Sequence, residues 1–488
     1  MFRKIRIGLA MIVSIAITLL FLDVTGSLHS YLGWLAKIQF WPALLALNFG
    51  VLFILIALTL LLGRAYCSVI CPLGIMQDLF SWIGGKVKKN RFSFSSEKRI
   101  LRYVVLAIFV LLTLFGFNVI ALYIEPYSAY GRIVNSLIQP IYVGANNLLA
   151  SLAERVDSYA FYEVETLAKA IPTVIVALIT LVVIAFLSFR NGRTWCNTIC
   201  PVGTLLGFLA KYSWFKPVIN SEKCIACGLC EKNCKASCIN AKTKEIDYSR
   251  CVTCMNCIDK CKKGAIQYIH PAKAEKSEET VDDARRKFLA TGAVMAATLT
   301  VNAQAKKVDG GLTVIQDKKI PERKTPVKPA GSLSAKNFAT HCTACQLCVS
   351  ACTNNVLRPS TRLESMLQPE LSFESGYCRP ECVKCSEACP TGAIHPITTV
   401  EKSSIKIGKA IFFKENCVVN TDGVECGNCA RRCPVGAITM IPSEELGGRK
   451  IPAVNTERCI GCGACENLCP ARPFSAIYVE GYDTHIEA

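Results

Sequence analysis

Residues 63–74 read GRAYCSVICPLG, and residues 192–203 read GRTWCNTICPVG. Seven of these twelve positions are identical, and each copy follows a long apolar run. The repeat predicts two related membrane hairpins that bring four cysteines together at one face of a bilayer. These cysteines are Cys67, Cys71, Cys196 and Cys200. Four thiolates at one place suit a soft metal or an iron–sulfur centre. A redox dithiol and a pair of structural turns are the alternatives.

The composition narrows the class of protein. The chain has 488 residues, of which 51% are hydrophobic and 19% charged, with a formal net charge of +18. Its length excludes a small disulfide scaffold, and its apolar content excludes a wholly disordered chain. The basic residues are not interleaved with aromatic residues on one periodic face, so we expect no nucleic-acid partner. Of the 29 cysteines, four lie in residues 1–215 and 25 in the remainder.

Four apolar runs in the first half are long enough to cross a bilayer, which takes about 20 residues. They are Ile5–Leu22, Pro42–Leu62, Ile100–Ile124 and Ala170–Phe189. Buried core helices are the alternative. The basic flanks predict that the N-terminus, the 63–99 loop and the segment after span four are cytoplasmic, whereas the 125–169 loop faces outward. On that outer side, Glu125 and His29 are either acceptors of quinol protons or ordinary loop residues.

Two cysteine runs follow the membrane half, each with the C-x-x-C-x-x-C-x-x-x-C spacing of bacterial ferredoxins. In that arrangement three cysteines hold one 4Fe–4S cluster and the fourth ligates the other cluster of the pair. We therefore expect one cluster on Cys224, Cys227, Cys230 and Cys261, and a second on Cys251, Cys254, Cys257 and Cys234.

Two lysines and one cysteine depart from this pattern. Lys235 and Lys262 stand where a proline usually follows the fourth cysteine, and their charges should raise the cluster potentials. Cys238 is an extra cysteine without a place in the pattern.

Four further runs occupy the C-terminal part and predict four more 4Fe–4S clusters. The first and last keep the ferredoxin spacing, whereas the middle two have insertions in the first gap. Zinc and disulfides are the rival uses of these cysteines. The four runs are Cys342, Cys345, Cys348 and Cys352; Cys378, Cys382, Cys385 and Cys389; Cys417, Cys426, Cys429 and Cys433; and Cys459, Cys462, Cys465 and Cys469.

An internal export signal is predicted between the two cysteine-rich blocks. Arg285 and Arg286 precede the mildly apolar stretch Phe288–Val301, which ends in an A-x-A sequence at 303–305. A twin arginine followed by a weak apolar region is typical of Tat signals. An ordinary fifth span is the alternative. Either reading places residues 306–488 outside, with residues 306–336 as a flexible basic tether.

Residues 1–270 resemble the NapH family, and residues 280–488 resemble the NapG and MauM family. The resemblance implies a helical membrane bundle of four spans plus a Tat-type signal or anchor helix, with two ferredoxin-like α+β modules. The expected domains are a membrane domain (1–215), a cytoplasmic two-cluster domain (216–270), a linker (271–336) and a periplasmic four-cluster domain (337–488). The expected location is the bacterial inner membrane, with residues 216–287 in the cytoplasm.

The resemblance implies a quinol dehydrogenase that draws on the quinone pool and passes electrons to a periplasmic cytochrome c or terminal reductase. Its cofactors would be six 4Fe–4S clusters, with an additional metal at the CxxxCP cysteines. With five histidines and only His29 near a span, no bis-histidine haem can form in the bilayer. A bound quinone or a partner subunit would then link the two sides. The alternatives are a metal-reducing maturation protein, a passive scaffold and an electron conduit from a cytoplasmic ferredoxin.

Overall fold

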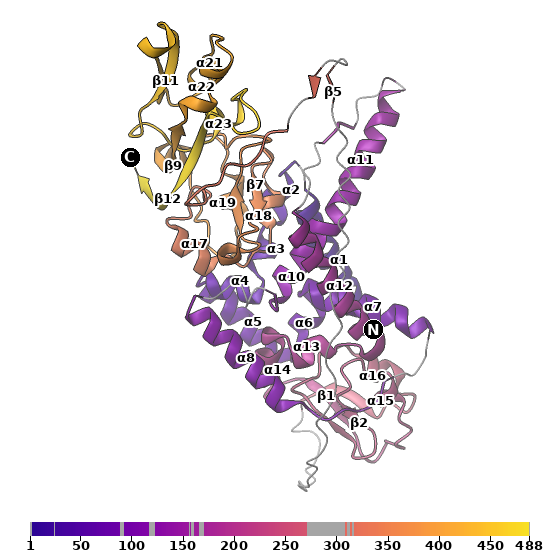
Figure 1. The fold of residues 1–488 in the computed structure, drawn as a ribbon. Coiled ribbons are helices and arrows are strands. Elements are labelled where there is room, and N and C mark those ends of the chain that lie inside the picture. The colour runs from indigo at the N-terminus through magenta and orange to yellow at the C-terminus, as the bar shows by residue number, and fades with distance from the viewer. Residues whose placement is uncertain are drawn as a thin grey trace, which may run out of the picture.

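In a computed structural model the chain folds into three parts: an N-terminal helical part, a small cysteine-rich module at one end of it and a larger cysteine-rich module at the other (Figure 1). The structure describes residues 2–23, 25–87, 92–116, 123–155, 157, 161–164, 170–270, 308–309, 313–314 and 317–487. The predicted twin-arginine signal and the A-x-A sequence lie outside these residues.

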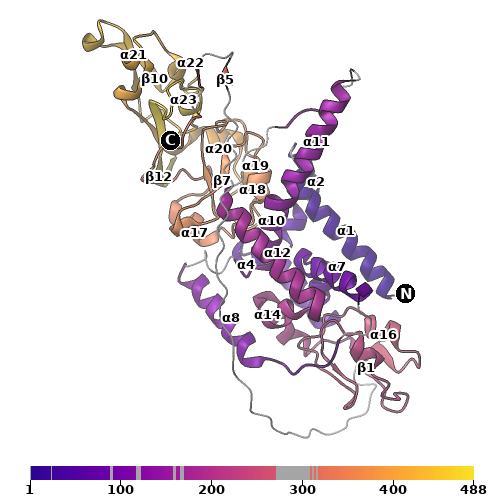
Figure 2. The ribbon, with the colours of Figure 1, turned by 45° about the vertical axis from the view of Figure 1, so that its right-hand side comes forward.

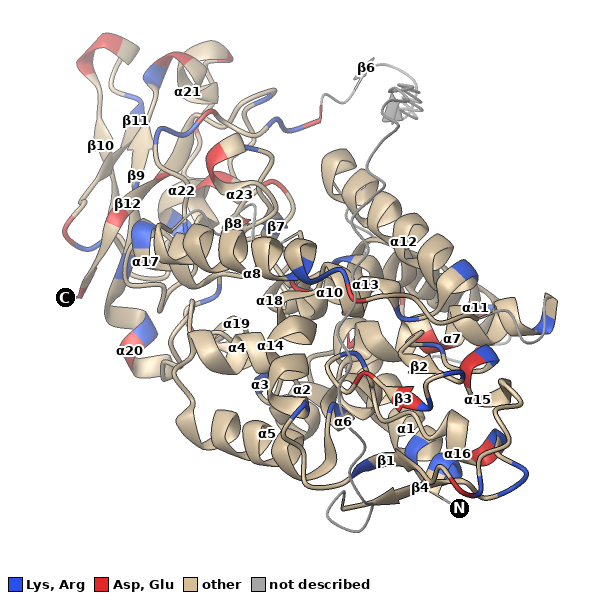
Figure 3. Cartoon of the chain, turned by 90° about the horizontal axis from the view of Figure 1, so that it is seen from below, with Lys and Arg blue, Asp and Glu red and all other residues tan. Residues whose placement is uncertain are grey.

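The helical part contains two long apolar helices and a set of shorter ones. The described helices are α1 (Phe2–Leu22), α2 (Leu28–Leu32), α3 (Trp34–Lys37), α4 (Phe40–Leu45), α5 (Phe49–Leu62), α6 (Ala65–Val69), α7 (Pro72–Val87), α8 (Arg99–Leu114), α10 (Pro126–Ile133), the π-helix η1 (Val134–Ile138), α11 (Gln139–Glu154), α12 (Ile171–Asn191), α13 (Thr194–Thr198) and α14 (Pro201–Ala210). Helix α7 packs along α12 and also contacts α10 and α1. Helix α5 and almost all of α12 carry no charged side chains (Figure 3).

Among the described residues, two helices are long and apolar enough to cross a membrane, α1 and α12, rather than the four expected. The run Pro42–Leu62 is broken between α4 and α5, because Leu47 adopts a left-handed backbone with φ of 51°. The Asn48 side chain then caps α5 by accepting a hydrogen bond from the backbone N–H of Val51 at 3.2 Å. In the run Ile100–Ile124 the described helix is α8, with 16 residues. At 1.5 Å per residue, α5 and α8 are shorter than the roughly 30 Å hydrocarbon layer.

The small module (216–270) has the paired-strand form of a two-cluster ferredoxin. Strands β1 (Lys216–Ile219) and β4 (Ile266–Ile269) pair antiparallel, as do β2 (Ile239–Asn240) and β3 (Glu245–Ile246). The short helices α15 (Leu229–Lys232) and α16 (Asn256–Lys260) each begin inside a cysteine run.

The large module is built around the long antiparallel pair β9 (Ile405–Phe412) and β12 (Ile477–Glu487). Two smaller antiparallel pairs flank it, β7 (Leu357–Pro359) with β8 (Pro369–Leu371) and β10 (Ile438–Pro442) with β11 (Lys450–Val454). Its helices are α17 (Ala335–His341), α18 (Leu347–Ser350), α19 (Lys384–Ala388), α20 (Thr399–Ser404), α21 (Val418–Thr421), α22 (Asn428–Arg431) and α23 (Ala464–Asn467). A two-residue pair, β5 (Val308–Asp309) and β6 (Thr313–Val314), precedes the module.

Residues 317–336 belong to the large module and differ from the flexible tether expected there. Val327 is fully buried in its core, and Lys328 is buried as well. Arg323 forms a buried ion pair with Glu466. Of the basic residues that suggested a tether, Lys318, Arg323 and Lys328 thus have partners in the folded module.

The two cysteine-rich modules contact opposite ends of α1 (Figure 2). At the start of the helix, Arg3 pairs with Asp259 of the small module at 2.6 Å. Beyond its end, the carbonyl of Thr25 accepts a hydrogen bond from Lys384 of the large module at 2.8 Å. With 21 residues, α1 separates these contacts by roughly 30 Å.

Candidate iron–sulfur and thiolate sites

The small module gathers its cysteines around two cavities. Site A is lined by Cys224, Cys227, Cys230 and Cys261. Site B is lined by Cys234, Cys251, Cys254 and Cys257, and Cys238 is a fifth cysteine in its wall. Apart from Cys238, these are the two sets that the ferredoxin spacing predicts, with the fourth cysteine exchanged between runs. Site A lies toward the free surface, since Cys227 is exposed, whereas Cys234, Cys254 and Cys257 of site B are buried against the helical part.

The large module repeats this exchange twice. Site D is lined by Cys378, Cys382 and Cys385 together with Cys352 from the preceding run. Site E is lined by Cys459, Cys462 and Cys465 together with Cys433.

The remaining cysteines form two complementary sets. Burial raises the pKa of Cys342, and the thiols of Cys345 and Cys389 raise it further. Burial likewise raises the pKa of Cys429, to about 11, with Cys426, Cys469 and Cys417 as its thiol neighbours. Site C therefore consists of Cys342, Cys345, Cys348 and Cys389, and site F of Cys417, Cys426, Cys429 and Cys469.

The four sites of the large module follow one another in space. Sites C and D share one hydrophobic core, and sites E and F share another. The two cores meet where the backbone N–H of Cys378 (site D) donates to the carbonyl of Cys462 (site E) at 2.9 Å. Site C lies against the helical part, because a Cβ at Gly131 of α10 would collide with the carbonyl oxygen of Cys345. The order outward from the helical part is thus C, D, E and F.

The four CxxxCP cysteines of the sequence repeat converge in the helical part, and we call them the repeat centre. All four cysteine residues are 3–4% exposed. Burial raises the pKa of Cys200, and Cys196, Cys71 and Cys67 raise it further, which places the four thiols together. Among the described residues no three His, Cys, Asp or Glu side chains are arranged to hold a single metal ion, and this applies equally to sites A–F.

The two copies of the repeat hold each other by reciprocal arginine contacts. The Arg64 guanidinium donates to the carbonyl of Cys196 at 3.1 Å, and the Arg193 guanidinium donates to the carbonyl of Cys67 at 2.6 Å. A glycine in the opposite copy leaves room for each arginine. A Cβ at Gly203 would stand 2.8 Å from Arg64 Nη2, and a Cβ at Gly74 would stand 2.7 Å from Arg193 Nη1.

Polar groups also reach the sulfur atoms of the repeat centre. Gln77 Nε2 donates to Cys196 Sγ at 3.2 Å, and the backbone N–H of Gly203 donates to Cys200 Sγ at 3.3 Å. Arg64 Nη2 lies 3.8 Å from Cys67 Sγ. Such donors favour a thiolate over a thiol. Gln77 is a buried residue of α7 that sequence reasoning missed, since nothing in its spacing relates it to Cys196.

A buried ion cluster joins the repeat to the small module. Asp78 Oδ2 lies 2.6 Å from Lys235 and 3.2 Å from Arg6, and its Oδ1 lies 2.6 Å from Arg193. Burial alone would raise the pKa of Asp78, but Arg193 and Lys235 hold it well below its usual range. The charge of Lys235 is thus matched by a carboxylate. We therefore expect Lys235 to raise the cluster potential less than the sequence suggests. Its main role is to link the small module to Asp78 of α7.

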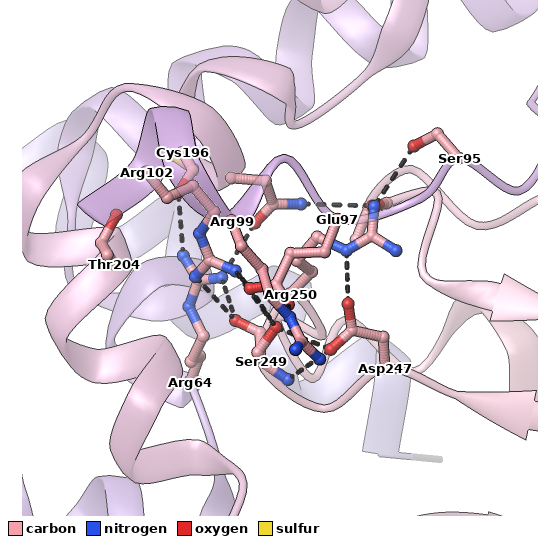
Figure 4. A network of polar contacts seen from close by, with 12 residues as sticks. Arg64, Ser95, Glu97, Arg99, Arg102, Cys196, Thr204, Asp247, Ser249 and Arg250 are labelled. Carbon is pink, nitrogen blue, oxygen red and sulfur yellow. Dashed lines mark hydrogen bonds and ion pairs between the residues drawn. The ribbon is translucent and has the colours of Figure 1, made fainter. Parts of the chain in front are cut away.

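A second polar network fixes the loop that carries Cys251 (Figure 4). Ser249 is its centre: its carbonyl accepts from Arg64 at 3.2 Å, and its hydroxyl accepts from Arg102 at 3.1 Å. Glu97 pairs with Arg102, and Arg250 pairs with Asp247 at 2.6 Å. Arg102, which lies inside the predicted third span, is buried at the junction with site B.

The two residues considered for proton uptake, Glu125 and His29, have local partners. Glu125 caps α10, with its carboxylate accepting from the backbone N–H groups of Tyr127 and Ser128. His29 Nδ1 lies 3.1 Å from Asp23 Oδ2. Cys238 lies beside site B, with its Sγ 3.5 Å from that of Cys234.

Six sets of four cysteines, exchanged pairwise as in two-cluster ferredoxins, define an iron–sulfur protein of the ferredoxin type. Two family models match the chain. A 4Fe–4S binding domain matches residues 44–90 and 173–221, and a 4Fe–4S dicluster domain matches residues 424–472. The first match contains the CxxxCP cysteines.

The chain is similar to several curated proteins over part of its length. It is 26% identical to YccM of Escherichia coli K12, whose name ascribes to it a role in electron transport, over 42% of this chain and 51% of YccM. It is 29% identical to the ferredoxin-type protein NapF of Escherichia coli K12, over 32% of this chain and 87% of NapF. It is 32% identical to the methylamine utilization ferredoxin-type protein MauM of Methylobacillus flagellatus, over 30% of this chain and 64% of MauM.

The chain thus spans about half of YccM and most of NapF. No solved structure matches it. The likeness to MauM agrees with the resemblance expected for the C-terminal half, whereas the NapH likeness of residues 1–270 stays an expectation.

Proposed function

We propose that the protein is a membrane-anchored electron-transfer protein with 4Fe–4S clusters at sites A–F, which oxidises quinol beside site D and passes the electrons outward through sites E and F. One observation carries the quinol part. A cavity of about 810 Å³ lies between the helical part and the large module, and Cys352, a member of site D, lines it. A quinol bound there would have a cluster ligand in its wall.

The lining of this cavity suits a quinol. Pro140 and Val143 supply apolar surface, and Gln139, Glu163 and Glu370 supply polar groups. Glu370 Oε2 is buried, and the described structure shows no hydrogen-bond partner for it. Quinol oxidation releases two protons with its two electrons, so a carboxylate beside the hydroxyl groups would serve as the proton acceptor. The volume falls in the 300–1,000 Å³ range typical of small-molecule sites.

The membrane placement is part of the proposal. Helices α1 and α12 supply two crossings, and the shorter helices α5 and α8 both pack against α14. The small module would then face the cytoplasm and the large module the periplasm, because the two modules contact opposite ends of α1. The periplasmic acceptor, a cytochrome c or a terminal reductase, would receive electrons at site F, the site farthest from the helical part.

The proposal is tested with anaerobic membranes that contain the protein. Adding a menaquinol analogue should reduce the clusters of sites C to F, observed by EPR. Val143→Trp should fill the cavity and abolish that reduction while the iron content is unchanged. Val400→Trp, at an exposed position of α20, is the matched control and should leave it unaffected. Quinol reduction that survives Val143→Trp would place the quinol elsewhere, and inert quinol would refute the assignment.

A further inference from the structure

The repeat centre lies between the two ferredoxin-like modules. In Figure 1 the helices α6 and α13, which carry Cys67 and Cys196, separate the small module below from α18 of the large module above. One continuous buried core contains Cys254 and Cys257 of site B, Cys67, Cys71 and Cys200 of the repeat centre, and Cys345 of site C. The thiols of three separate sites therefore share one buried core.

The repeat centre contacts the site B loops directly. The backbone N–H of Arg193 donates to the carbonyl of Lys235 at 2.7 Å, next to Cys234. Asn197, next to Cys196, donates to the carbonyl of Ala236 at 3.2 Å. Arg64 reaches Ser249 O, two residues before Cys251. Both copies of the repeat are thus hydrogen-bonded to the loops that present site B.

Aromatic side chains occupy the interior between the repeat centre and site C. Tyr66, next to Cys67, is buried, and its hydroxyl donates to Gln39 Oε1 at 3.0 Å. Tyr127 is buried against Phe21, with 5.9 Å between the ring centroids, and Phe21 in turn lies at Gly131, which meets Cys345. Tyr66, Phe21 and Tyr127 belong to the one buried core that also holds Cys67 and Cys345, and the charged residues Glu125 and Arg132 are buried beside it.

The charge at the repeat centre points to an anionic occupant. Arg64 is 0% exposed, and among the described residues it forms no ion pair with a carboxylate. Its Nε has no hydrogen-bond partner there, while its Nη2 faces Cys67 Sγ. A buried guanidinium without a counter-ion is costly. An iron–sulfur centre held by four thiolates carries a net negative charge and would supply the missing counter-charge, whereas four neutral thiols would not.

We propose that Cys67, Cys71, Cys196 and Cys200 hold an iron–sulfur centre that relays single electrons between site B and site C, so that the chain itself is a continuous conductor between its two ends. This rests on the iron–sulfur part of the proposed function and not on quinol. In each step the reduced site B cluster is oxidised as the centre is reduced, and the centre is re-oxidised as site C gains the electron. No bond forms or breaks. The donor is a reduced ferredoxin at site A, and the electron leaves beyond site F to an oxidised cytochrome.

This relay changes the expectation drawn from the sequence, where a bound quinone or a partner subunit had to connect the two sides. That expectation followed from the shortage of histidines for a haem. The repeat centre offers thiolate ligands instead.

The test uses the full chain in sealed, quinone-free proteoliposomes with the small module facing outward and reduced two-cluster ferredoxin added outside. EPR spin counting measures how many clusters become reduced. We expect all six sites to be reduced in the wild type, and only sites A and B in Cys196→Ala. Thr198→Ala, on the same short helix with its hydroxyl donating to the Thr194 carbonyl at 2.7 Å, is the matched control and should behave as the wild type.

Two further measurements distinguish loss of the centre from misfolding: the iron content of Cys196→Ala and the behaviour of Gln77→Leu. Cys196→Ala should lose only the iron in excess of the six clusters. Gln77→Leu keeps every thiolate, so it should retain all the iron but shift the EPR signal of the centre. Reduction of all six sites in Cys196→Ala, reduction that stops at two sites in the wild type, or zinc in place of iron at the centre would overturn the relay. Adding a menaquinol analogue to Cys196→Ala tests quinol oxidation separately, since it should still reduce sites C to F.

Discussion

Asp78 is a single carboxylate among three cations, and this makes it the most sensitive charged residue at the junction. In Asp78→Asn, Arg6, Arg193 and Lys235 would keep their charges in a buried place without a partner. Breaking a buried ion pair in this way costs about 3–5 kcal/mol. We expect a lowered melting temperature and protease sensitivity of the small module. Lys235→Met should have a smaller effect, because two cations still face Asp78; an equal effect would mean that Lys235 dominates the cluster.

The same carboxylate predicts how the junction responds to acid. The folded-state pKa of Asp78 lies below its unfolded value, so its stabilising contribution is complete above the unfolded pKa of about 4 and is lost as the pH falls through the folded value. We therefore expect the small module to remain attached between pH 8 and about pH 4. Hydrogen exchange of residues 216–270 would measure this. Release of the module near pH 5 would assign the junction to other groups.

Cys238 gives a second residue-level prediction. Its thiol lies beside Cys234, and hydrogen bonding links it to Cys251 as well. An S–H donor to cluster thiolates stabilises the more negative, reduced cluster. Cys238→Ala should therefore lower the reduction potential of site B without loss of iron, in an anaerobic EPR titration. Loss of one cluster's iron would instead make Cys238 a ligand.

Residue-level sequence reasoning works where the spacing of ligands is fixed by a metal centre. The sets at sites A and B follow from the C-x-x-C-x-x-C-x-x-x-C runs alone. The insertions between Cys378 and Cys382 and between Cys417 and Cys426 obscured the pairing in the large module, although the same exchange operates there. The contacts of Lys235 and Gln77 depend on residues more than 100 positions away, so no local pattern could reveal them.

At the scale of elements, the glycines of α7 provide a matched pair of variants. A Cβ at Gly74 would collide with the Cys67 carbonyl and crowd Arg193, whereas a Cβ at Gly85 would meet nothing within 4 Å. Gly74→Ala should therefore destabilise the protein by about 1–3 kcal/mol, the usual cost of overpacking. Gly85→Ala should be neutral or stabilise it by about 0.5–1 kcal/mol through helix propensity. Thermal melts would show it, and equal melting temperatures would mean that the repeat can widen without penalty.

The helices also show which apolar runs hydropathy alone can identify as single long helices. The apolar runs at the positions of α1 and α12 predict single helices correctly, because nothing interrupts them. The run Pro42–Leu62 is equally apolar, yet Asn48 provides an N-cap in its middle and the chain turns there. A hydropathy average does not register one capping residue. Helix α7 was not predicted, because residues 63–99 were expected to form a loop. The structure shows that this helix packs against α12.

For the whole molecule, metal content is the first quantity to measure. Protein prepared without air should contain about 24 iron and 24 sulfide from six clusters of four iron atoms. The repeat centre should add iron beyond that number, in an amount that Cys196→Ala removes. Stoichiometric zinc with little sulfide would contradict the cluster assignment at every site.

Export is the second property at this scale. Changing Arg285 and Arg286 to Lys should leave the large module in the cytoplasm, because the Tat system reads the arginine pair rather than charge. Protease treatment of spheroplasts would then spare residues 317–487. A large module that stays exposed to protease would mean export by another route.

The contacts at the far end of α1 have a consequence for assembly. In the proposed topology the large module folds around its clusters on one side of the membrane, crosses, and then docks where Phe21 and Gly131 meet Cys345. Until the module docks, the apolar surface around Phe21 and Gly131 is exposed. A covalent connection by a short flexible linker holds two partners at an effective concentration on the order of millimolar, so even a weak interface remains closed. Cutting the chain between the helical part and the large module after docking would make their association reversible, and its occupancy would then depend on the protein concentration.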